Sequence, residues 1–453
     1  MQETVLNYIG EKKFSRLREL LAEMNPADIA VILDEVNEND LPIVFRILPK
    51  ELAAEVFAYI ESDMQQFLIE KFSDKELKAV LDELFLDDTV DIIEEMPTNV
   101  TKRILKQTDA ATRKLINQLL AYPEDSAGSI MTPEYIDLKK DMTVEEAFDK
   151  IRSVGLETET IYTCYVIDRS RHLLGIVTVK DLLLSPKDCI IADIMEENII
   201  FANTLDDRED VVSQFDKYDF LALPVVDKEN RLVGIVTVDD AIDVLQEEAT
   251  EDIEKMAAIL PTDKPYFKIS IFDTFKSRIP WLLLLMISAT FTGAIITSFE
   301  AKLTVLPALI TFIPMLMNTA GNGGSQSSVT VIRALSLGDV EFKDILKVIW
   351  KETRVAFICS LVLAVVNFIK MYLVDYLLLH TFDTGHQIME IVVVCLTLFA
   401  TVIIAKIVGC ILPLIAKKIG FDPTVMASPF ITTIVDTISL AVYFNVAIFL
   451  LKI

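Results

Sequence analysis

Two patterns of hydrophobic residues divide the chain. Residues 1 to 122 carry apolar side chains at three- and four-residue spacing, as in PADIAVILDEV, DLPIVFRILP and ELAAEVFAYI. This spacing is typical of amphipathic helices, and the short polar breaks predict helical hairpins that stack into a small superhelix. From Ile279 onward the pattern changes to long, nearly uncharged stretches, which predict helices that span a membrane.

We predict five spans, each near the roughly 20 residues that a membrane-crossing helix requires. They cover Ile279–Phe299, Leu303–Thr319, Val355–Leu379, Ile388–Ile415 and Met426–Leu451. Lysine and arginine gather before the first span, between the second and third, and between the fourth and fifth. By the positive-inside rule the long N-terminal part is then cytosolic, and the C-terminus lies outside.

The region between these two parts contains an internal repeat. LLGIVTVKDLL (Leu173–Leu183) recurs as LVGIVTVDDAI (Leu232–Ile242), and Ile130-Met131 recurs as Ile194-Met195. Each β-branched run predicts a buried strand, and the acidic residue after it predicts the capped start of a helix. We therefore expect two α+β units of the same fold.

Charge is unevenly distributed along the chain. Of 68 acidic residues, 58 precede Trp281, and with 42 basic residues the net charge is −26. Such a field attracts cations and repels nucleic acids and anionic lipids, although an acidic surface can also serve solubility alone. The five cysteines show no paired spacing, which favours a reducing cytosol and a membrane over a disulfide framework. The first residues lack the apolar core of a signal peptide.

One carboxylate lies near the middle of the fifth apolar stretch. Asp436 follows ASPFITTIV, in which Ser428, Thr432 and Thr433 offer hydroxyl oxygens. An ionised carboxylate at that depth is costly unless it faces a pore, a partner or a cation, so Asp436 predicts an ion path. The alternative is a structural ion pair between Asp436 and Lys406 of the fourth stretch.

The second apolar stretch runs into a glycine-rich polar segment, NTAGNGGSQSS (Asn318–Ser328). Its glycines permit close backbone approach and a broken helix, which at membrane depth is tolerated where the chain lines protein or water. Asn322, Gln326, Ser327 and Ser328 can hold a hydrated ion through its waters. Alternatively, the glycines serve tight helix packing.

The order of these parts resembles a known family. The doubled GIVTVxD ending resembles a tandem pair of CBS domains, and GNGGSQSS together with DPTVMASPFITTIVD (Asp422–Asp436) resembles the MgtE family of magnesium channels. The resemblance covers essentially the whole chain, although Ala320 and Ser325 stand where many members have Gly and Thr. It implies a multidomain fold with an α-helical superhelical N-terminal domain (1–122), an α+β tandem CBS pair (123–194 and 195–246), a connecting or plug helix (247–278) and an all-α five-helix transmembrane domain (279–453).

The resemblance implies Mg²⁺ uptake through a homodimer in the cell membrane, and no enzymatic activity. In the family the pore follows the twofold axis, and the fifth-span Asp, here Asp436, carries the ion. The expected pore residues are Asp436, Gly321, Asn322, Gly324 and Ala427. Because Mg²⁺ keeps most of its water and takes one or two carboxylates, a ring of two Asp436 side chains suits it.

Two other classes of protein fit less well. A membrane zinc protease with CBS domains needs HExxH, and none of His172, His380 and His386 stands in that pattern. A secondary transporter of another divalent cation, such as Co²⁺ or Mn²⁺, is the nearer alternative, but five spans do not divide into two inverted repeats.

Acidic residues of the cytosolic part predict a Mg²⁺ sensor. Like-charged surfaces repel when they close on one another, and divalent cations between them reverse that interaction. We expect cytosolic Mg²⁺ to close the channel in this way and low Mg²⁺ to release the connecting helix. The expected regulatory ligands are Asp87, Asp91, Asp207, Glu209, Asp219, Asp240, Asp243, Glu248, Glu251 and Asp252.

The CBS resemblance also implies a nucleotide site. In that family the Thr and Asp of the motif can hold the ribose of an adenine nucleotide such as ATP; here they are Thr178 with Asp181, or Thr237 with Asp240. Alternatively, the pair is a hinged, dimerising sensor module. The partners we expect are a second copy of the chain and the lipid bilayer, without nucleic acid.

Overall fold

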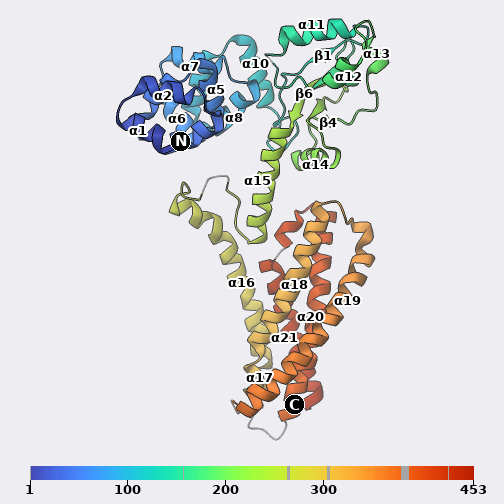
Figure 1. The fold of residues 1–453 in the computed structure, drawn as a ribbon. Coiled ribbons are helices and arrows are strands. Elements are labelled where there is room, and N and C mark those ends of the chain that lie inside the picture. Colours follow the sequence, from blue (N-terminus) through green and yellow to red (C-terminus); the bar gives the residue numbers. More distant parts are fainter. Residues whose placement is uncertain are drawn as a thin grey trace. The chain divides into compact units, whose positions relative to one another are not determined.

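The structure, a computed structural model, describes residues 2–156, 158–262, 266–303, 307–378, 387–426 and 428–452. It divides into two compact units, Met1–Gln246 and Glu247–Ile453, and each is described by itself. The first unit begins with short helices and continues with two small sheets, whereas the second consists of helices, most of them long (Figure 1). This confirms the predicted multidomain class.

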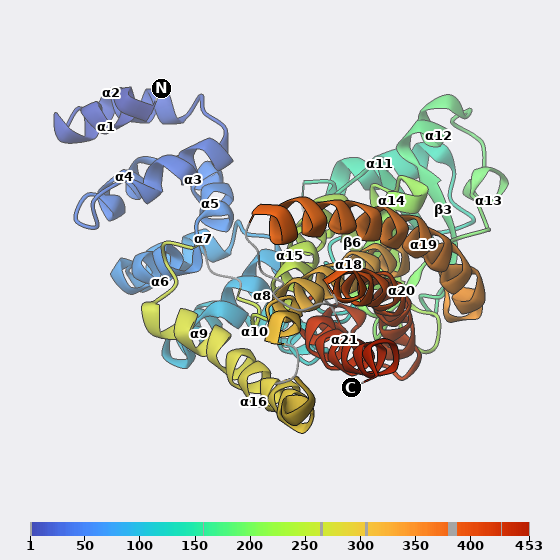
Figure 2. The same ribbon diagram turned by 90° about the horizontal axis from the view of Figure 1, so that it is seen from below.

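Ten helices form the N-terminal part of the described chain. They are α1 (Gln2–Gly10), α2 (Phe14–Leu21), α3 (Pro26–Asp34), α4 (Leu41–Ile47), α5 (Lys50–Tyr59), α6 (Ser62–Lys71), α7 (Asp74–Leu81), α8 (Leu86–Glu95), α9 (Thr98–Gln107) and α10 (Ala110–Leu119). Side-chain caps on Asn25, Ser73 and Asp109 start three of them. Helices two apart pack together, α3 on α5, α5 on α7 and α4 on α6, which produces a stacked superhelix (Figure 2). The apolar positions of the sequence pattern are buried in one continuous core.

Two three-stranded sheets of the same topology follow. The first contains β1 (Asp137–Leu138), β2 (Thr163–Ile167) and β3 (Leu173–Thr178), and the second contains β4 (Ala202–Asn203), β5 (Ala222–Val226) and β6 (Leu232–Thr237). In each, the middle strand pairs in parallel with the first strand and antiparallel with the last. The helices of this region are α11 (Val144–Val154), α12 (Val179–Leu184), α13 (Ile191–Ile194), α14 (Arg208–Tyr218) and α15 (Val238–Met256). The sequence repeat is therefore a structural repeat.

The repeated methionines explain the two glycines of the strands. A β-carbon at Gly234 would lie 2.8 Å from Met131 Sδ, and one at Gly175 would lie 2.9 Å from Met195 Sδ. The segment that leads into each repeat thus packs on the last strand of the other repeat, where short backbone bridges also form. This exchange joins the two repeats into one pair.

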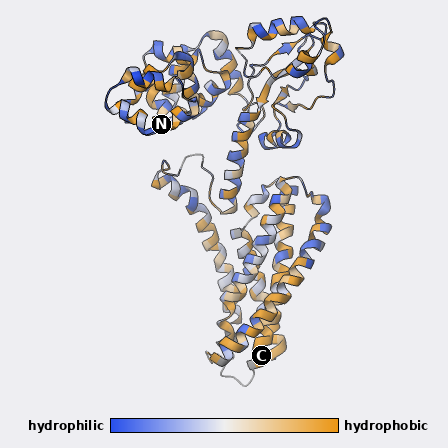
Figure 3. Ribbon diagram, viewed as in Figure 1, coloured by the Kyte–Doolittle hydropathy of each residue, from blue (hydrophilic) through white to orange (hydrophobic). Residues whose placement is uncertain are grey.

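The second unit is helical. Its elements after α15 are α16 (Ile271–Leu303), α17 (Pro307–Ile310), α18 (Ile313–Ser336), a 3₁₀ turn (Phe342–Asp344), α19 (Ile345–Lys370), a π-helix (Met371–Leu378), α20 (Gln387–Lys418), a 3₁₀ turn (Pro423–Met426) and α21 (Ser428–Leu451). Hydrophobic residues dominate most of these helices (Figure 3). Among the described residues, four segments are long and apolar enough to cross a membrane: Ile271–Phe299, Phe342–Tyr376, Ile388–Lys418 and Pro423–Leu451.

Helix α18 differs from what the sequence predicted. We expected a span over Leu303–Thr319 that breaks at the glycines, but α18 continues as one helix through the whole glycine-rich segment. Its 24 residues measure about 36 Å, enough to cross a bilayer, although its polar residues make it less apolar than the four segments above. Residues 304–306 lie outside the described part of the chain. A fifth span stays a prediction.

The glycines of α18 serve close packing instead. A β-carbon at Gly409 of α20 would overlap the carbonyl group of Gly324, and one at Gly324 would lie 3.1 Å from the Ala405 carbonyl oxygen. The backbones of α18 and α20 are therefore in contact at this crossing, as small residues allow in membrane helices.

We predict that Gly409→Ala destabilises the second unit by about 1–3 kcal/mol, the usual cost of overpacking. The matched control is Gly293→Ala on α16, because a β-carbon there meets no atom within 4 Å. Thermal unfolding of both variants in the same detergent measures the difference. Equal melting temperatures would contradict the backbone contact.

Candidate metal sites

Asp436 on α21 faces a cavity of about 470 Å³. The residues that line it are Ile313, Pro314, Met317, Asn318, Gly321, Asn322, Thr432 and Asp436. Gly321 permits the close approach of α18 to α21, since a β-carbon there would lie 3.0 Å from Thr432 Cγ2 and 3.8 Å from Asp436 Oδ1. The structure thus brings together three of the expected pore residues, Asp436, Gly321 and Asn322.

Three other sequence expectations have different outcomes. Gly324 is buried in the packing between helices and does not line this cavity, so its expected place on the ion path stays a prediction. Lys406 Nζ donates a hydrogen bond to Ser327 Oγ at 3.3 Å. No ion pair joins Lys406 to Asp436 in the part of the chain that is described, so that alternative is wrong. Ala427 lies outside the described residues.

One face of α18 is polar along much of its length. Asn318, Asn322 and Gln326 recur at four-residue spacing and are exposed in the single chain. Asn322 Nδ2 donates to Asn318 Oδ1 at 3.2 Å. Amides facing lipid would lack further partners, so this polar stripe of Asn318, Asn322 and Gln326 requires water or protein against it.

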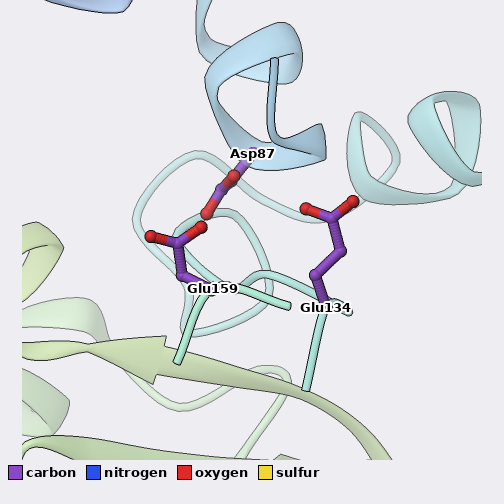
Figure 4. A group of neighbouring side chains, drawn as sticks. All are labelled: Asp87, Glu134 and Glu159. Carbon is purple, nitrogen blue, oxygen red and sulfur yellow. The ribbon is translucent and has the colours of Figure 1, made fainter. Parts of the chain in front are cut away.

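A second group of carboxylates lies between α8 and the CBS pair. Asp87 is in the first turn of α8, and Glu134 and Glu159 come from two loops and point toward it (Figure 4). One oxygen of each lies within 4.8 Å of the others. The Leu86 N–H donates to Glu134 Oε2 at 2.9 Å, and the Glu159 N–H donates to the Glu134 carbonyl oxygen at 2.9 Å. We call this the Asp87–Glu134–Glu159 cluster.

This cluster is half-buried and consists of acids alone. Burial, and then repulsion from neighbouring acids, raises the pKa of Asp87 to about 7 and that of Glu159 to about 8. Burial likewise raises the pKa of Asp91 to about 8 and that of Asp240 to about 7, and Asp87 adds to both. Glu159 Oε2 is buried without a hydrogen-bond partner among the described residues. A hard divalent cation would compensate both the charge and this oxygen.

The sequence found only part of this group. Asp87, Asp91 and Asp240 lie together as expected, and burial followed by repulsion from Asp239 raises the pKa of the nearby Asp243. The expected ligands did not include Glu134 and Glu159 of the cluster. They also omitted Asp88, whose pKa is raised to about 6 by burial. No signal marks Glu134 or Glu159, because neither stands in a ligand motif.

The structure separates the acids expected on α14. Asp207 caps this helix by accepting from the Glu209 N–H at 2.9 Å. Asp219 lies beyond the other end, in the left-handed conformation with φ 56°. Because α14 has 11 residues, its ends are about 16 Å apart, and Asp219 cannot share an ion with Asp207 or Glu209.

Acids near the end of α15 meet the segment that precedes α21. Glu251 and Asp422 each pair with Lys255 at 2.7 Å. Burial, and then repulsion from Asp422, raises the pKa of Asp252. Glu248 lies one turn before Asp252 on the same helix. The expected acids of this group therefore have a further neighbour, Asp422, and a compensating cation, Lys255.

The Thr and Asp residues of the two CBS motifs contact each other. Thr178 Oγ1 donates to Asp181 Oδ2 in the capping box of α12, and Thr237 Oγ1 donates to Asp240 Oδ2. Thr237 is buried, whereas Thr178 is half-buried. Asp240 also belongs to the acids around Asp87, whereas Asp181 is not among them.

Comparisons with known proteins decide the family. The MgtE family model, described as a divalent cation transporter, matches residues 313–446, the MgtE intracellular N domain matches 24–125, and the CBS domain matches 127–187 and 191–247. The magnesium transporter MgtE of Thermus thermophilus is 35% identical over 96% of this chain and 95% of its own length. The chain belongs to the MgtE family. Its Bacillus subtilis MgtE relative is 33% identical over 98% of each chain.

Solved structures of MgtE proteins agree with the first unit. The cytosolic domain of the Mg²⁺ channel MgtE in complex with ATP has a TM-score of 0.52 at 35% identity, covering 54% of this chain and 100% of that one. The soluble part of a magnesium transporter also has a TM-score of 0.52, at 30% identity, covering 55% of this chain and 98% of that one. The MgtE resemblance and the CBS pair predicted from sequence are thereby confirmed.

The raised pKa values predict a pH dependence. The pKa of these carboxyls is about 4 in the unfolded chain and about 7 or 8 in the folded one, so the folded state resists their ionisation. The metal-free first unit therefore loses stability as pH rises from about 4 to about 8. A cation binds the ionised form, so Mg²⁺ should stabilise the protein little at about pH 5 and more at about pH 8. Scanning calorimetry with and without Mg²⁺ measures this.

The control for that experiment is the variant Asp87→Asn with Glu159→Gln. Neutral amides remove the repulsion, so its metal-free stability should depend less on pH and its response to Mg²⁺ should shrink. A Mg²⁺ effect of equal size at both pH values would exclude these acids as ligands.

Proposed function

We propose that this chain conducts Mg²⁺ into the cell as a homodimer, with two Asp436 side chains facing each other across the twofold axis. The observation that carries the proposal is the shared cavity of Asp436, Gly321 and Asn322. Mg²⁺ releases water reluctantly, so carboxylates and amides that contact a hydrated ion suit it better than a closed cage. The names of the Thermus thermophilus and Bacillus subtilis relatives support the same cargo.

The exposed amides of α18 support the dimer. A polar stripe at membrane depth is stable against water or another chain, and a second copy related by a twofold axis would present the same stripe. The space between two such stripes would be a hydrated path through the membrane. In this arrangement the first unit lies in the cytosol, and with five spans the C-terminus lies outside.

Cytosolic Mg²⁺ closes this path in our proposal. The Asp87–Glu134–Glu159 cluster, with Asp91 and Asp240, lacks any pairing lysine or arginine among the described residues, and an ion there would hold α8 against the CBS pair. Helix α15 links the sites, because Asp240 lies in its first turn and Lys255 in its last, where Lys255 contacts Asp422 just before α21. Loss of the ion would therefore release a helix that is tied to the Asp436 helix.

ATP is a further proposed ligand of the CBS pair. A relative's cytosolic domain has been solved in complex with ATP, and the half-buried Thr178–Asp181 motif is the better placed of the two motifs here. Binding at the pair would add a second cytosolic signal to the Mg²⁺ control.

Asp436→Asn should abolish most Mg²⁺ uptake, because an amide cannot supply the charge that offsets the ion's dehydration. Its control is Asp339→Asn, an exposed acid outside the Asp436 cavity. Mg²⁺ flux into proteoliposomes, compared at equal amounts of folded dimer, decides the matter. Normal flux in Asp436→Asn would refute the ion path, and flux that depends on a proton gradient would favour a secondary transporter.

Asp87→Asn with Glu159→Gln should keep the channel open at millimolar-range Mg²⁺, since the cluster then lacks the ligands that close it. Asp28→Asn is the control, because Asp28 is an exposed acid in the first turn of α3 and belongs neither to the cluster nor to the expected ligands. Patch recording and Mg²⁺ protection of Glu247–Pro261 against proteolysis supply two readouts. If the double variant closes and is protected like the control, the cluster is not the sensor.

A further inference from the structure

Three buried polar residues join three helices of the second unit. Ser327 of α18 donates from Oγ to Glu352 Oε2 of α19 at 2.6 Å, and it accepts a hydrogen bond from Lys406 Nζ of α20 at 3.3 Å. Glu352 is 8% exposed, Lys406 6% and Ser327 1%. We call these residues the Glu352–Ser327–Lys406 network.

The network compensates two buried charges. Lys406 lies within the predicted span Ile388–Ile415, and Glu352 lies just before the predicted span Val355–Leu379; both side chains are buried, where an uncompensated charge is costly. The Ser327 hydroxyl donates its one hydrogen bond to Glu352 and accepts a hydrogen bond from Lys406 through a lone pair. Opposite charges on α19 and α20 are thus linked through one directed group on α18. Removing one charge would leave the other buried alone, which costs more than removing both.

The network lies beside a contact that cannot fix a helix rotation by itself. Ser327 follows Gly324 by three residues, and Lys406 precedes Gly409 by three. At those glycines the backbones of α18 and α20 touch without interlocking side chains. The hydrogen bonds between Ser327 and the two neighbouring helices therefore hold α18 in one rotation about its axis, which the glycine contact alone does not do.

There is space on both sides of the polar stripe. Lys406 lines a second cavity of about 500 Å³, which also contacts Asn318, Asn322 and Gln326. Asn318 and Asn322 line the Asp436 cavity as well. Because Asn318 and Asn322 already line both cavities, a small rotation of α18 would change how far they face each of them.

We propose that the Glu352–Ser327–Lys406 network sets the rotation of α18 and thereby determines how Asn318 and Asn322 face Asp436. Its members are positioning residues, since they act on the ion only through α18. The inference rests on the proposed function, because it specifies how the ion path of that function is shaped.

A double-mutant cycle in Mg²⁺ uptake tests the proposal. Lys406→Gln or Glu352→Gln alone should raise the half-saturating Mg²⁺ concentration about tenfold at equal amounts of folded dimer, and the double variant should return to within about threefold of the parent. Ser327→Ala should resemble the single variants, and Ser327→Thr, which keeps the hydroxyl, should restore uptake. Ser360→Ala is the control, because that buried hydroxyl bonds only within its own helix.

The half-saturating concentration separates positioning from stability. A network that merely stabilises would lower yield and maximal uptake without changing this concentration, and that result would overturn the proposal. A double variant as impaired as the worse single variant would also overturn it. If the single charge variants do not fold, the half-saturating Mg²⁺ concentrations of Ser327→Ala and Ser327→Thr are compared instead.

A second measurement does not depend on transport. In a chain whose native cysteines are replaced, the rate at which a maleimide modifies Asn322→Cys reports the direction of the stripe. We expect this rate to change about fivefold or more with Lys406→Gln and to recover in the double variant, as coupled neighbours do. If the parent protein transported no Mg²⁺, the proposed function would be wrong. The modification rate of Asn322→Cys would still test the network. Unchanged rates would contradict it.

Discussion

The cost of burying a carboxylate governs both units of this chain. A buried acid must be protonated, paired with a cation or supplied with water, since its ionised form is strongly destabilised away from solvent. Acids of the second unit use the last two of these solutions. Glu352 has Lys406 through Ser327, Asp422 has Lys255, and Asp436 has a cavity lined by amides.

The Asp87–Glu134–Glu159 cluster has no pairing lysine or arginine among the described residues, and its acids resist ionisation instead. Its acids keep raised pKa values because burial and mutual repulsion act in the same direction. An acid that already has a lysine gains little from a divalent ion, whereas an uncompensated group gains much. This difference favours the cluster, over acids such as Glu251, which pairs with Lys255, as the sensor that we propose.

Glycine and serine have divided roles in α18. Gly321 and Gly324 bring the helix close to α21 and α20, while Ser327 fixes its direction and Asn322 faces the cavities. An unbroken helix can carry all these contacts because four-residue spacing places different residue types on different faces. The glycine-rich segment is therefore a packing surface and a polar stripe at once.

The sequence by itself determined the superhelix, the CBS repeat and the apolar helices, and it singled out Asp436 as the candidate for the ion path. Each of these depends on a pattern along the chain, either the spacing of apolar residues or a charge within an apolar run. Only the tertiary structure decided which buried charges meet. Glu134 and Glu159 join Asp87 from separate loops, and α14 holds Asp207 and Asp219 apart. Partners distant in sequence are set by how elements pack, and one-dimensional patterns do not contain that information.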